Sequence, residues 1–305
     1  MTMKIPRNLV FALLLALALA VVAFAQAAAP ESKQVEIFGQ KIHYLEAGSA
    51  SNPAVILLHG LGGDLSNWAM TVPALASKYH VYVPDQIGFG KSDKPLVNYR
   101  VAMLVEFLDV FCKKLGIRKA TLVGNSLGGW TAAAYAIDHP EKVDKIVLVC
   151  AAGYTAKRYG GQEVSKDLIT ALNPSTTADL KRGLSAIFYN KAMLTDAFIE
   201  QALTAKFKRG DGYTINSFIE SIMRGEDYID DKVKTIKAPT LVLWGREDGL
   251  TPLAMGKAFA EDIPGAQMVV IEQCGHVPQM EKPAEFNAAL LKFLGGAATA
   301  QSQTK

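Results

Sequence analysis

One short stretch constrains the fold of this 305-residue chain more than any other: residues 124–128 read Gly-Asn-Ser-Leu-Gly and join a β-prone run to a helix-prone run. The preceding residues, 120–123, are apolar, and residues 127–139 have helical periodicity and end before Pro140. A sharp strand-to-helix turn lifts its central side chain clear of the sheet, and flanking glycines let strand and helix approach closely. The pattern therefore predicts that Ser126 is an exposed nucleophile at the edge of a sheet.

Short β-like runs alternate with helical patterns along most of the chain. The predicted strands are residues 35–38, 42–46, 55–58, 81–83, 121–123, 146–149, 240–244 and 268–272. The predicted helices between or after them are residues 99–115, 127–139, 253–262 and 283–294. Antiparallel strands followed by β-α-β alternation are typical of an α/β protein whose sheet becomes parallel.

The alternation of predicted strands and helices is interrupted between residues 153 and 237. This stretch contains helix-like segments and no convincing strand; the segments are residues 163–172, 177–188, 196–207 and 214–223. Helices inserted between two strands form a lid over the carboxyl ends of the sheet, where open α/β sheets bind ligands. The expected organisation is a core in two parts, 31–152 and 238–295, with a helical lid, 153–237, and a flexible tail, 296–305.

The first 29 residues differ in kind from the rest. Lys4 and Arg7 precede an uncharged apolar run, residues 9–29, which contains the small-x-small pattern Ala25-Gln26-Ala27. These features predict a signal peptide, residues 1–27, and therefore an exported protein, periplasmic or secreted. The alternative is an uncleaved membrane anchor, because residues 9–29 as a helix would reach about 31 Å. N-terminal sequencing decides, since a mature protein that starts at Met1 or Thr2 excludes cleavage.

Composition and charge narrow the class of ligand. The formal charge is +3, and Lys and Arg are scattered among acidic residues, which argues against a nucleic-acid partner. A small, neutral or apolar ligand is expected. The three cysteines, Cys112, Cys150 and Cys274, are too few and too irregularly spaced for a metal site or a disulfide framework. Small buried side chains are expected at Cys112 and Cys150, and Cys274 is disfavoured as a nucleophile against Ser126.

An activated serine needs a base, and the base needs an acid to orient it. His276 follows the last predicted strand, whereas the positions of the histidines at 43, 80 and 139 favour structural roles. Asp248 follows the previous strand and gives the chain order Ser, Asp, His. Glu247 is the alternative carboxylate; adjacent side chains point apart, so only one of the two can face the imidazole, and Asp248 is favoured.

Attack on a carbonyl group also requires two N–H donors for the negative charge that develops on oxygen. The backbone N–H of Leu127, at the start of the helix after the nucleophile, is one candidate. The second is the backbone N–H of Leu61, in the glycine-rich loop that follows the third predicted strand. We expect His59, which opens this loop, to hold the loop and not to act as a base.

Taken together, these motifs resemble those of the α/β-hydrolases, over nearly all of residues 35–294. The shared motifs are His59-Gly60 followed by Trp68, Pro84-Asp85-Gln86-Ile87-Gly88-Phe89-Gly90-Lys91-Ser92, Gly124-Asn125-Ser126-Leu127-Gly128, Trp244-Gly245-Arg246-Glu247-Asp248 and Gly275-His276-Val277-Pro278. The resemblance, to the lid-bearing esterase and lipase type, implies an α/β-hydrolase fold with an eight-stranded, mostly parallel sheet and the lid between strands 6 and 7. It also implies an acyl-serine intermediate that water hydrolyses, without a cofactor or metal.

The subfamily is ambiguous. Asn125 resembles the elbow of carbon–carbon bond hydrolases that act on aromatic ring-cleavage products, but Val277 stands where those enzymes tend to carry tryptophan. Residues 173–176 with 187–189 instead resemble monoacylglycerol-lipase-like and bacterial lipase-like members. The expected activity is hydrolysis of small apolar esters with short to medium acyl chains, mono- or triacylglycerols among the candidates. The alternatives are carbon–carbon cleavage of a vinylogous diketone and a non-catalytic ligand-binding protein.

The predicted lid carries large apolar side chains that suit an acyl-chain pocket, although packing of the lid helices onto the core is the favoured role for any one of them. They are Phe188, Met193, Phe198, Phe207, Phe218 and Met223.

Overall fold

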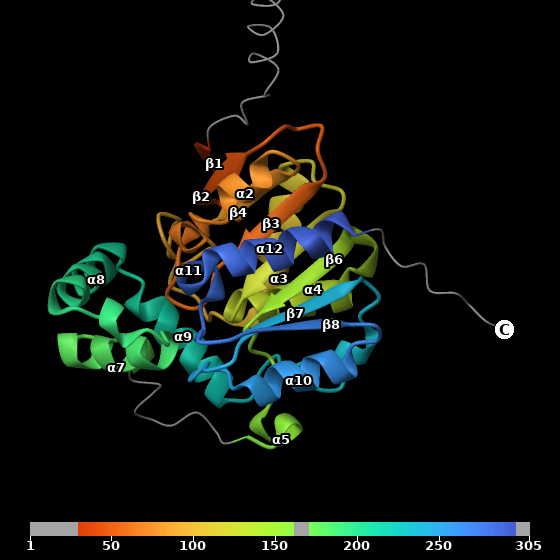
Figure 1. The fold of residues 1–305 in the computed structure, drawn as a ribbon. Helices are drawn as coiled ribbons and strands as arrows, with labels where there is room; N and C mark the ends of the chain where they lie inside the picture. The colour runs from red at the N-terminus through yellow and green to blue at the C-terminus, as the bar shows by residue number, and fades with distance from the viewer. Residues whose placement is uncertain (1–29, 162–170, 297–305) are drawn as a thin grey trace, which may run out of the picture.

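The computed structural model describes residues 30–161 and 171–296, which fold around one eight-stranded sheet (Figure 1). The strand order is β1-β2-β4-β3-β5-β6-β7-β8. Strand β2 pairs antiparallel with both β1 and β4, and every other adjacent pair is parallel. The expected mostly parallel α/β sheet is confirmed.

The predicted strands and helices appear in the structure with boundaries that shift by a few positions, apart from the predicted helix 163–172, most of which lies outside the described residues. The strands are β1 (Glu31–Ile37), β2 (Gln40–Ala47), β3 (Ala54–Leu58), β4 (His80–Pro84), β5 (Ala120–Asn125), β6 (Val143–Val149), β7 (Thr240–Gly245) and β8 (Gln267–Ile271). The α-helices are α2 (Val72–Ala76), α3 (Val101–Lys114), α4 (Leu127–Asp138), α5 (Ala156–Tyr159), α7 (Thr177–Ile187), α8 (Asp196–Arg209), α9 (Gly212–Met223), α10 (Leu253–Asp262), α11 (Pro278–Glu281) and α12 (Pro283–Gly295). Short 3-10 helices are Leu65–Trp68, Pro140–Lys142, Lys191–Met193 and Val233–Thr235.

The sheet is buried on both faces because its central strands are apolar at most positions. In β3, Ile56 and Leu58 face a core that includes α3, α4 and α10, whereas Val55 and Leu57 face a second core that includes α2 and α12. Successive strand residues point to opposite faces, so a continuous apolar run needs helices on both sides. Both faces are covered, and ligands can reach the sheet only at the strand ends.

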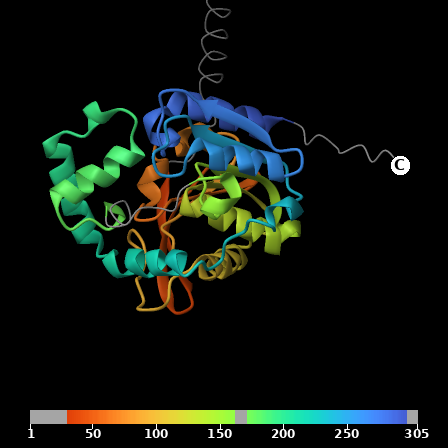
Figure 2. The same cartoon turned by 90° about the horizontal axis from the view of Figure 1, so that it is seen from below.

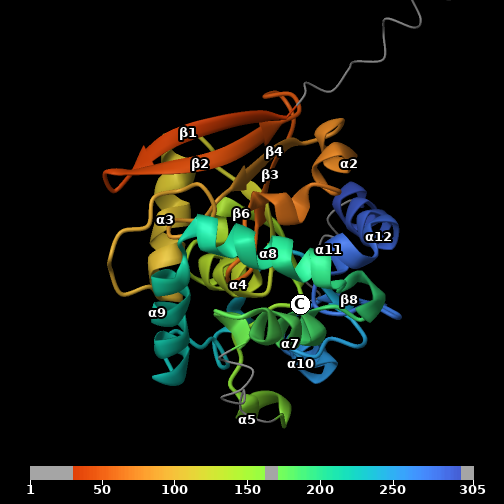
Figure 3. The same ribbon diagram turned by 90° about the vertical axis from the view of Figure 1, so that its left-hand side faces the viewer.

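The helices α5, α7, α8 and α9, called here the inserted helices, lie between β6 and β7 in the chain. Helices α7 and α8 group to one side of the core in Figure 2 and cross in front of the sheet in Figure 3. The predicted helix 163–172 falls mostly on residues outside the described ranges. That the inserted helices act as a lid stays a prediction.

The predictions for the two ends of the chain also concern residues that the structure does not describe. The described residues do not include the predicted signal peptide, residues 1–27, or the alternative anchor, residues 9–29. Of the predicted tail, 296–305, they include only Gly296. Within residues 30–161 and 171–296, no helix is long and apolar enough to cross a bilayer.

Candidate active site

The predicted site residues come from loops at the carboxyl ends of neighbouring parallel strands. Ser126 follows β5, Asp248 follows β7 and His276 follows β8, while the loop that contains Leu61 follows β3. Parallel strands that lie side by side deliver their following loops to one edge of the sheet. Segments that are far apart in sequence therefore meet at that edge.

Ser126 lies in a strained turn between β5 and α4. Its φ of 55° and ψ of −117° place it in a backbone region that non-glycine residues rarely occupy. Three backbone hydrogen bonds hold the turn: the N–H of Ser126 donates to Val149, and its carbonyl accepts from Trp130 and Ala152 at 3.0–3.2 Å. The surrounding fold thus fixes the serine at the edge of the sheet that the sequence predicts, but the residue is buried in the wall of a cavity and not exposed.

The glycines on each side of Ser126 are required because strand and helix nearly touch. A Cβ atom on Gly124 would stand 2.1 Å from the carbonyl oxygen of Gly128, and one on Gly128 would stand 2.3 Å from that of Leu58. Both clashes involve backbone atoms that cannot move aside.

Asp248 and His276 are buried and hydrogen-bonded, as the sequence predicts. The Nδ1 of His276 lies 2.8 Å from Oδ2 of Asp248. The carboxylate also accepts the backbone N–H groups of Leu250 and Thr251 at 2.8 and 2.9 Å and the hydroxyl of Thr251 at 2.7 Å. Four donors fix both carboxylate oxygens, so the imidazole has a well-defined partner.

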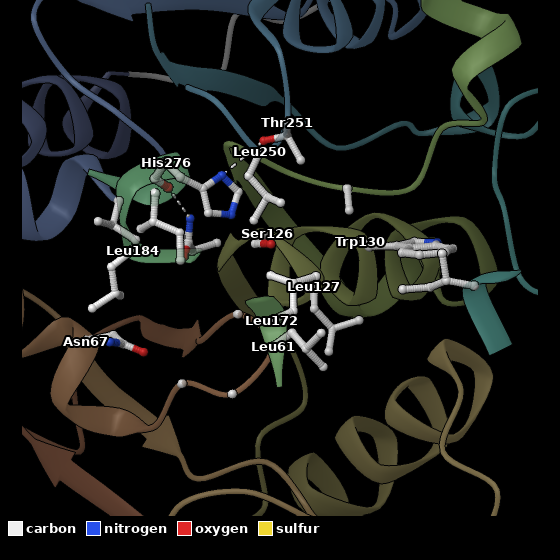
Figure 4. A pocket seen from close by; sticks show the side chains of 18 of the residues that line it. Leu61, Asn67, Ser126, Leu127, Trp130, Leu172, Leu184, Leu250, Thr251 and His276 are labelled. Carbon is white, nitrogen blue, oxygen red and sulfur yellow. Dashed lines mark hydrogen bonds between the residues drawn. The ribbon is translucent and has the colours of Figure 1, made fainter. Parts of the chain in front are cut away.

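Ser126 and His276 face each other across the cavity, with the imidazole ring over the serine hydroxyl (Figure 4). The Nε2 of His276 is buried and has no hydrogen-bond partner among the described residues. The hydrogen bond between Ser126 and His276 is therefore not made in this conformation, although both residues line the same cavity. Such bonds often tighten only when substrate binds.

Glu247, the alternative carboxylate, points away from the imidazole. Its side chain is exposed and accepts the backbone N–H of Cys274 at 3.0 Å. Glu247 thus braces the loop before His276, and Asp248 alone of the two faces the ring.

The loop after β3 contacts the nucleophile turn directly. A Cβ atom on Gly60 would stand 3.1 Å from Cβ of Ser126, and Leu61 and Leu127 line the cavity together with Ser126 (Figure 4). The structure thus brings both predicted donor residues to the serine, while their role as an oxyanion hole stays a prediction.

His59 holds this loop, as expected, and burial keeps it neutral. The ring is fully buried; Nδ1 lies 2.8 Å from the carbonyl oxygen of Gly60, and Nε2 accepts the backbone N–H of Gln86 at 3.1 Å. Burial lowers the pKa of His59, and the bond to Gly60 offsets this only in part. A neutral ring with one donor and one acceptor matches both contacts.

Two site residues were not predicted as such from the sequence. Asn125 donates hydrogen bonds to the carbonyl oxygens of Val149 and His276 at 3.1 and 3.0 Å. It thus connects the turn around Ser126 (the nucleophile turn) to the loop 272–277 that contains His276 (the histidine loop). The hydroxyl of Thr251 lies within 3.1 Å of His276 Nδ1 and of the Cys150 carbonyl oxygen. Thr251 follows Asp248 by three positions, a spacing at which a carboxylate can accept hydrogen bonds from the turn that follows it. This spacing is the sequence pattern that could have identified Thr251.

Cys150, Asp248 and His276 form the one cluster within the described ranges whose ligand atoms could hold a metal ion, all within 4.8 Å of one another. Burial, together with the nearby Asp248 carboxylate, raises the pKa of Cys150 well above its usual value. A neutral thiol is a poor metal ligand, and the other two residues already bond to each other. The cluster fits a hydrogen-bonded acid–base pair better than a metal site. All three cysteines are buried and free, and burial was expected of Cys112 and Cys150.

The cavity beside Ser126 has a volume of about 490 Å³ and a mainly apolar wall. Its two ends differ: Asn67 lies on one side of Ser126 and Trp130 on the other (Figure 4). Of the six apolar residues singled out in the predicted lid, Phe188, Phe198 and Met223 line this cavity. Phe218 instead packs in the core, and Met193 and Phe207 are exposed.

Comparisons with known proteins agree with this architecture. Residues 53–283 match the family model described as alpha/beta hydrolase fold. A 2-hydroxy-6-oxononadienedioate/2-hydroxy-6-oxononatrienedioate hydrolase of Paraburkholderia phymatum is 33% identical over 265 residues, which cover 84% of this chain and 91% of that protein.

This chain is also similar to two solved structures, each at 30% sequence identity. A membrane phospholipase A, described as a bacterial virulence factor, has a TM-score of 0.77 and covers 96% of this chain and 99% of its own. The meta-cleavage product hydrolase of Pseudomonas fluorescens IP01 has a TM-score of 0.75, with coverages of 86% and 97%.

The doubly covered parallel sheet, the strained serine turn and the acid–histidine pair define a hydrolase. The chain belongs to the alpha/beta hydrolase fold family. Within it, the curated relative is named as a dienedioate or trienedioate hydrolase, and the two solved structures are named as a meta-cleavage product hydrolase and a membrane phospholipase A.

Proposed function

We propose that this protein is a serine hydrolase that cleaves neutral carboxylic esters with short to medium acyl chains. The observation that carries the proposal is the pairing of Asp248 and His276 beside a strained Ser126, in the wall of a mainly apolar cavity. A nucleophile, a base and an orienting acid are the groups that acyl transfer requires.

In the proposed mechanism, His276 accepts the proton of Ser126 at Nε2 as the serine oxygen attacks the ester carbonyl carbon. Asp248 holds the Nδ1–H tautomer and stabilises the imidazolium that forms. The backbone N–H groups of Leu61 and Leu127 stabilise the oxyanion. His276 then protonates the leaving alcohol and activates the water that releases the acid.

The charges around the cavity favour a neutral substrate. Arg209 and His276 are the only basic residues among the described ones that line it. The guanidinium of Arg209 is already engaged, since Nε lies 3.3 Å from Asp211 and Nη1 lies 3.6 Å from Asp64. A substrate carboxylate would therefore find no uncompensated cation here.

Asp64 adds a negative charge to the same wall. Burial opposes its ionisation, yet hydrogen bonds from Ser66 hold its pKa below the ordinary value. Asp64 therefore helps to compensate the guanidinium of Arg209, and this end of the cavity offers no free positive charge to an anionic substrate group.

Carbon–carbon bond hydrolysis is the second candidate. It is favoured by the identity of 33% to a dienedioate hydrolase and by Asn125 in the nucleophile turn. By their names, the substrates of such relatives carry carboxylates, whereas the charges described above favour an uncharged ligand. We give the charge argument more weight, because a sequence identity near 30% fixes a fold more firmly than a substrate.

The test is an assay on p-nitrophenyl butyrate with the purified protein. We expect hydrolysis by the unaltered protein and a fall in kcat of about 10⁴-fold or more in Ser126→Ala, with a smaller fall in Asp248→Asn. Ester hydrolysis that survives in Ser126→Ala would refute the proposal. Activity on a 2-hydroxy-6-oxo-dienoate acid with none on the ester would replace it with the second candidate.

A further inference from the structure

The carboxyl-terminal end of the inserted helix α7 is joined to both loops that carry the proposed acid and base. The carbonyl oxygen of Ala186 accepts the backbone N–H of Gly249, next to Asp248, at 3.2 Å. That of Ile187 accepts the backbone N–H of His276 itself at 2.7 Å. The last carbonyls of any helix lack partners within the helix, and here the catalytic loops supply them.

The approach of α7 to the histidine loop is close. A Cβ atom on Gly275 would stand 2.1 Å from the carbonyl oxygen of Ile187, so this contact tolerates only glycine. Lys191 completes the end of the helix by donating to the carbonyl oxygens of Ser185 and Phe188. A cation at this end also complements the helix dipole.

One carboxylate fastens the histidine loop to the chain that follows α7. Glu281, at the end of α11, accepts the backbone N–H of Gly275 at 2.8 Å, of Tyr189 at 3.1 Å and of Asn190 at 2.6 Å. Bonds from N–H groups to a carboxylate are shorter and stronger than neutral ones. Glu281 therefore bridges the residue before His276 and the segment 189–190.

We propose that Glu281 is a positioning residue that, with the end of α7, holds the loop of His276 in register with Asp248 and Ser126. Glu281 does not contact the substrate, and it acts through His276. The inference rests on the proposed function, because it assigns His276 the role of base. It also makes part of the inserted segment a structural component of the site.

The central test compares Glu281→Gln with Glu285→Gln. Both substitutions remove one negative charge, but Glu285 is exposed on α12. The amide at position 281 would turn an NH₂ group toward backbone N–H donors, so the histidine loop should shift. Because misplacement of a catalytic group by about 1 Å can cost up to 10²-fold, we expect Glu281→Gln to lower kcat for p-nitrophenyl butyrate about 10-fold or more. KM should stay nearly constant, and Glu285→Gln should match the unaltered protein.

A second pair of variants serves if Glu281→Gln does not fold. Asn190 has a φ of −77°, which proline can adopt, and its side chain also accepts the N–H of Ala192. Asn190→Pro removes the N–H that reaches Glu281, whereas Asn190→Ala removes only the side-chain contact. We expect a lower kcat in Asn190→Pro than in Asn190→Ala.

The outcomes separate this inference from the proposed function. If Ser126→Ala abolishes hydrolysis but Glu281→Gln only lowers Tm and leaves kcat unchanged, Glu281 is merely structural and the inference is wrong. If hydrolysis survives in Ser126→Ala, the proposed function itself fails.

Discussion

At the scale of single residues, the protonation state of the His59 imidazole affects how the loop that contains Leu61 is held. The Nε2 of His59 can accept the N–H of Gln86 only while the ring is neutral. Burial lowers the pKa of His59 and so favours the neutral ring. Protonation would place a second N–H against that donor. The loop that contains Leu61 would then lose one of its fixed points.

The lowered pKa of His59 predicts how the free energy of unfolding depends on pH. An unfolded histidine titrates near pH 6.5, and the folded pKa of His59 lies lower, so below pH 6.5 the unfolded chain binds the additional proton. The contribution of His59 to stability is therefore complete above pH 6.5 and declines as the pH falls, by up to about 1.4 kcal/mol per pH unit.

Urea unfolding of the unaltered protein and of His59→Gln between pH 5 and 8 would measure this contribution. We expect a lower stability for His59→Gln and a shallower slope below pH 6.5. Identical slopes would contradict a buried neutral ring at His59.

The sequence predicted the three residues of the candidate triad but not the residues that hold them in place. Ser126, Asp248 and His276 each belong to a local motif next to a strand end, and local patterns are readable. Asn125 bonds to His276 and Glu281 bonds to Gly275 and Asn190, and these contacts exist only after distant segments have packed. A single sequence shows which side chains can hydrogen-bond but not which segments they will meet.

At the scale of elements, the junction of β5 and α4 depends on the closeness of two backbones. Gly128, in the first turn of α4, packs against the carbonyl oxygens of Leu58 and His59 at the end of β3. Because backbone atoms cannot rotate aside, any side chain there must displace the helix from the sheet.

Gly128→Ala should therefore destabilise the protein strongly. We expect a loss of roughly 3 kcal/mol or more in the free energy of unfolding, since the new Cβ would stand 2.3 Å from Leu58 O. Gly295→Ala is the matched control: its Cβ would meet nothing within 4 Å, and alanine should raise stability by up to about 1 kcal/mol. Thermal and urea unfolding measure both, and a Gly128→Ala protein as stable as the control would disprove the close approach.

The helices and strands were predictable to different degrees. Apolar periodicity found α10 at Leu253–Asp262 as predicted, because its amphipathic pattern ends at clear signals. The edge strand β1 (Glu31–Ile37) is longer than the predicted residues 35–38. Its first residues are polar and exposed, so pairing with β2, not apolar burial, extends it.

At the scale of the whole molecule, the ends of the sheet strands, the inserted helices and the loops between them line a cavity with Ser126 in its wall. The apolar wall and the compensated charge of Arg209 underlie the proposal of an uncharged ester, whereas the curated relative is named as a dienedioate or trienedioate hydrolase. Both candidate functions assign an activated nucleophile to Ser126. The identity of the nucleophile is therefore the claim on which the other conclusions depend.

The most direct test is mass spectrometry of the protein after reaction with a fluorophosphonate probe. We predict a single covalent adduct on Ser126, absent in Ser126→Ala and strongly reduced in a His276→Ala variant that folds normally. An adduct at another serine, or equal labelling of the unaltered protein and Ser126→Ala, would contradict the account.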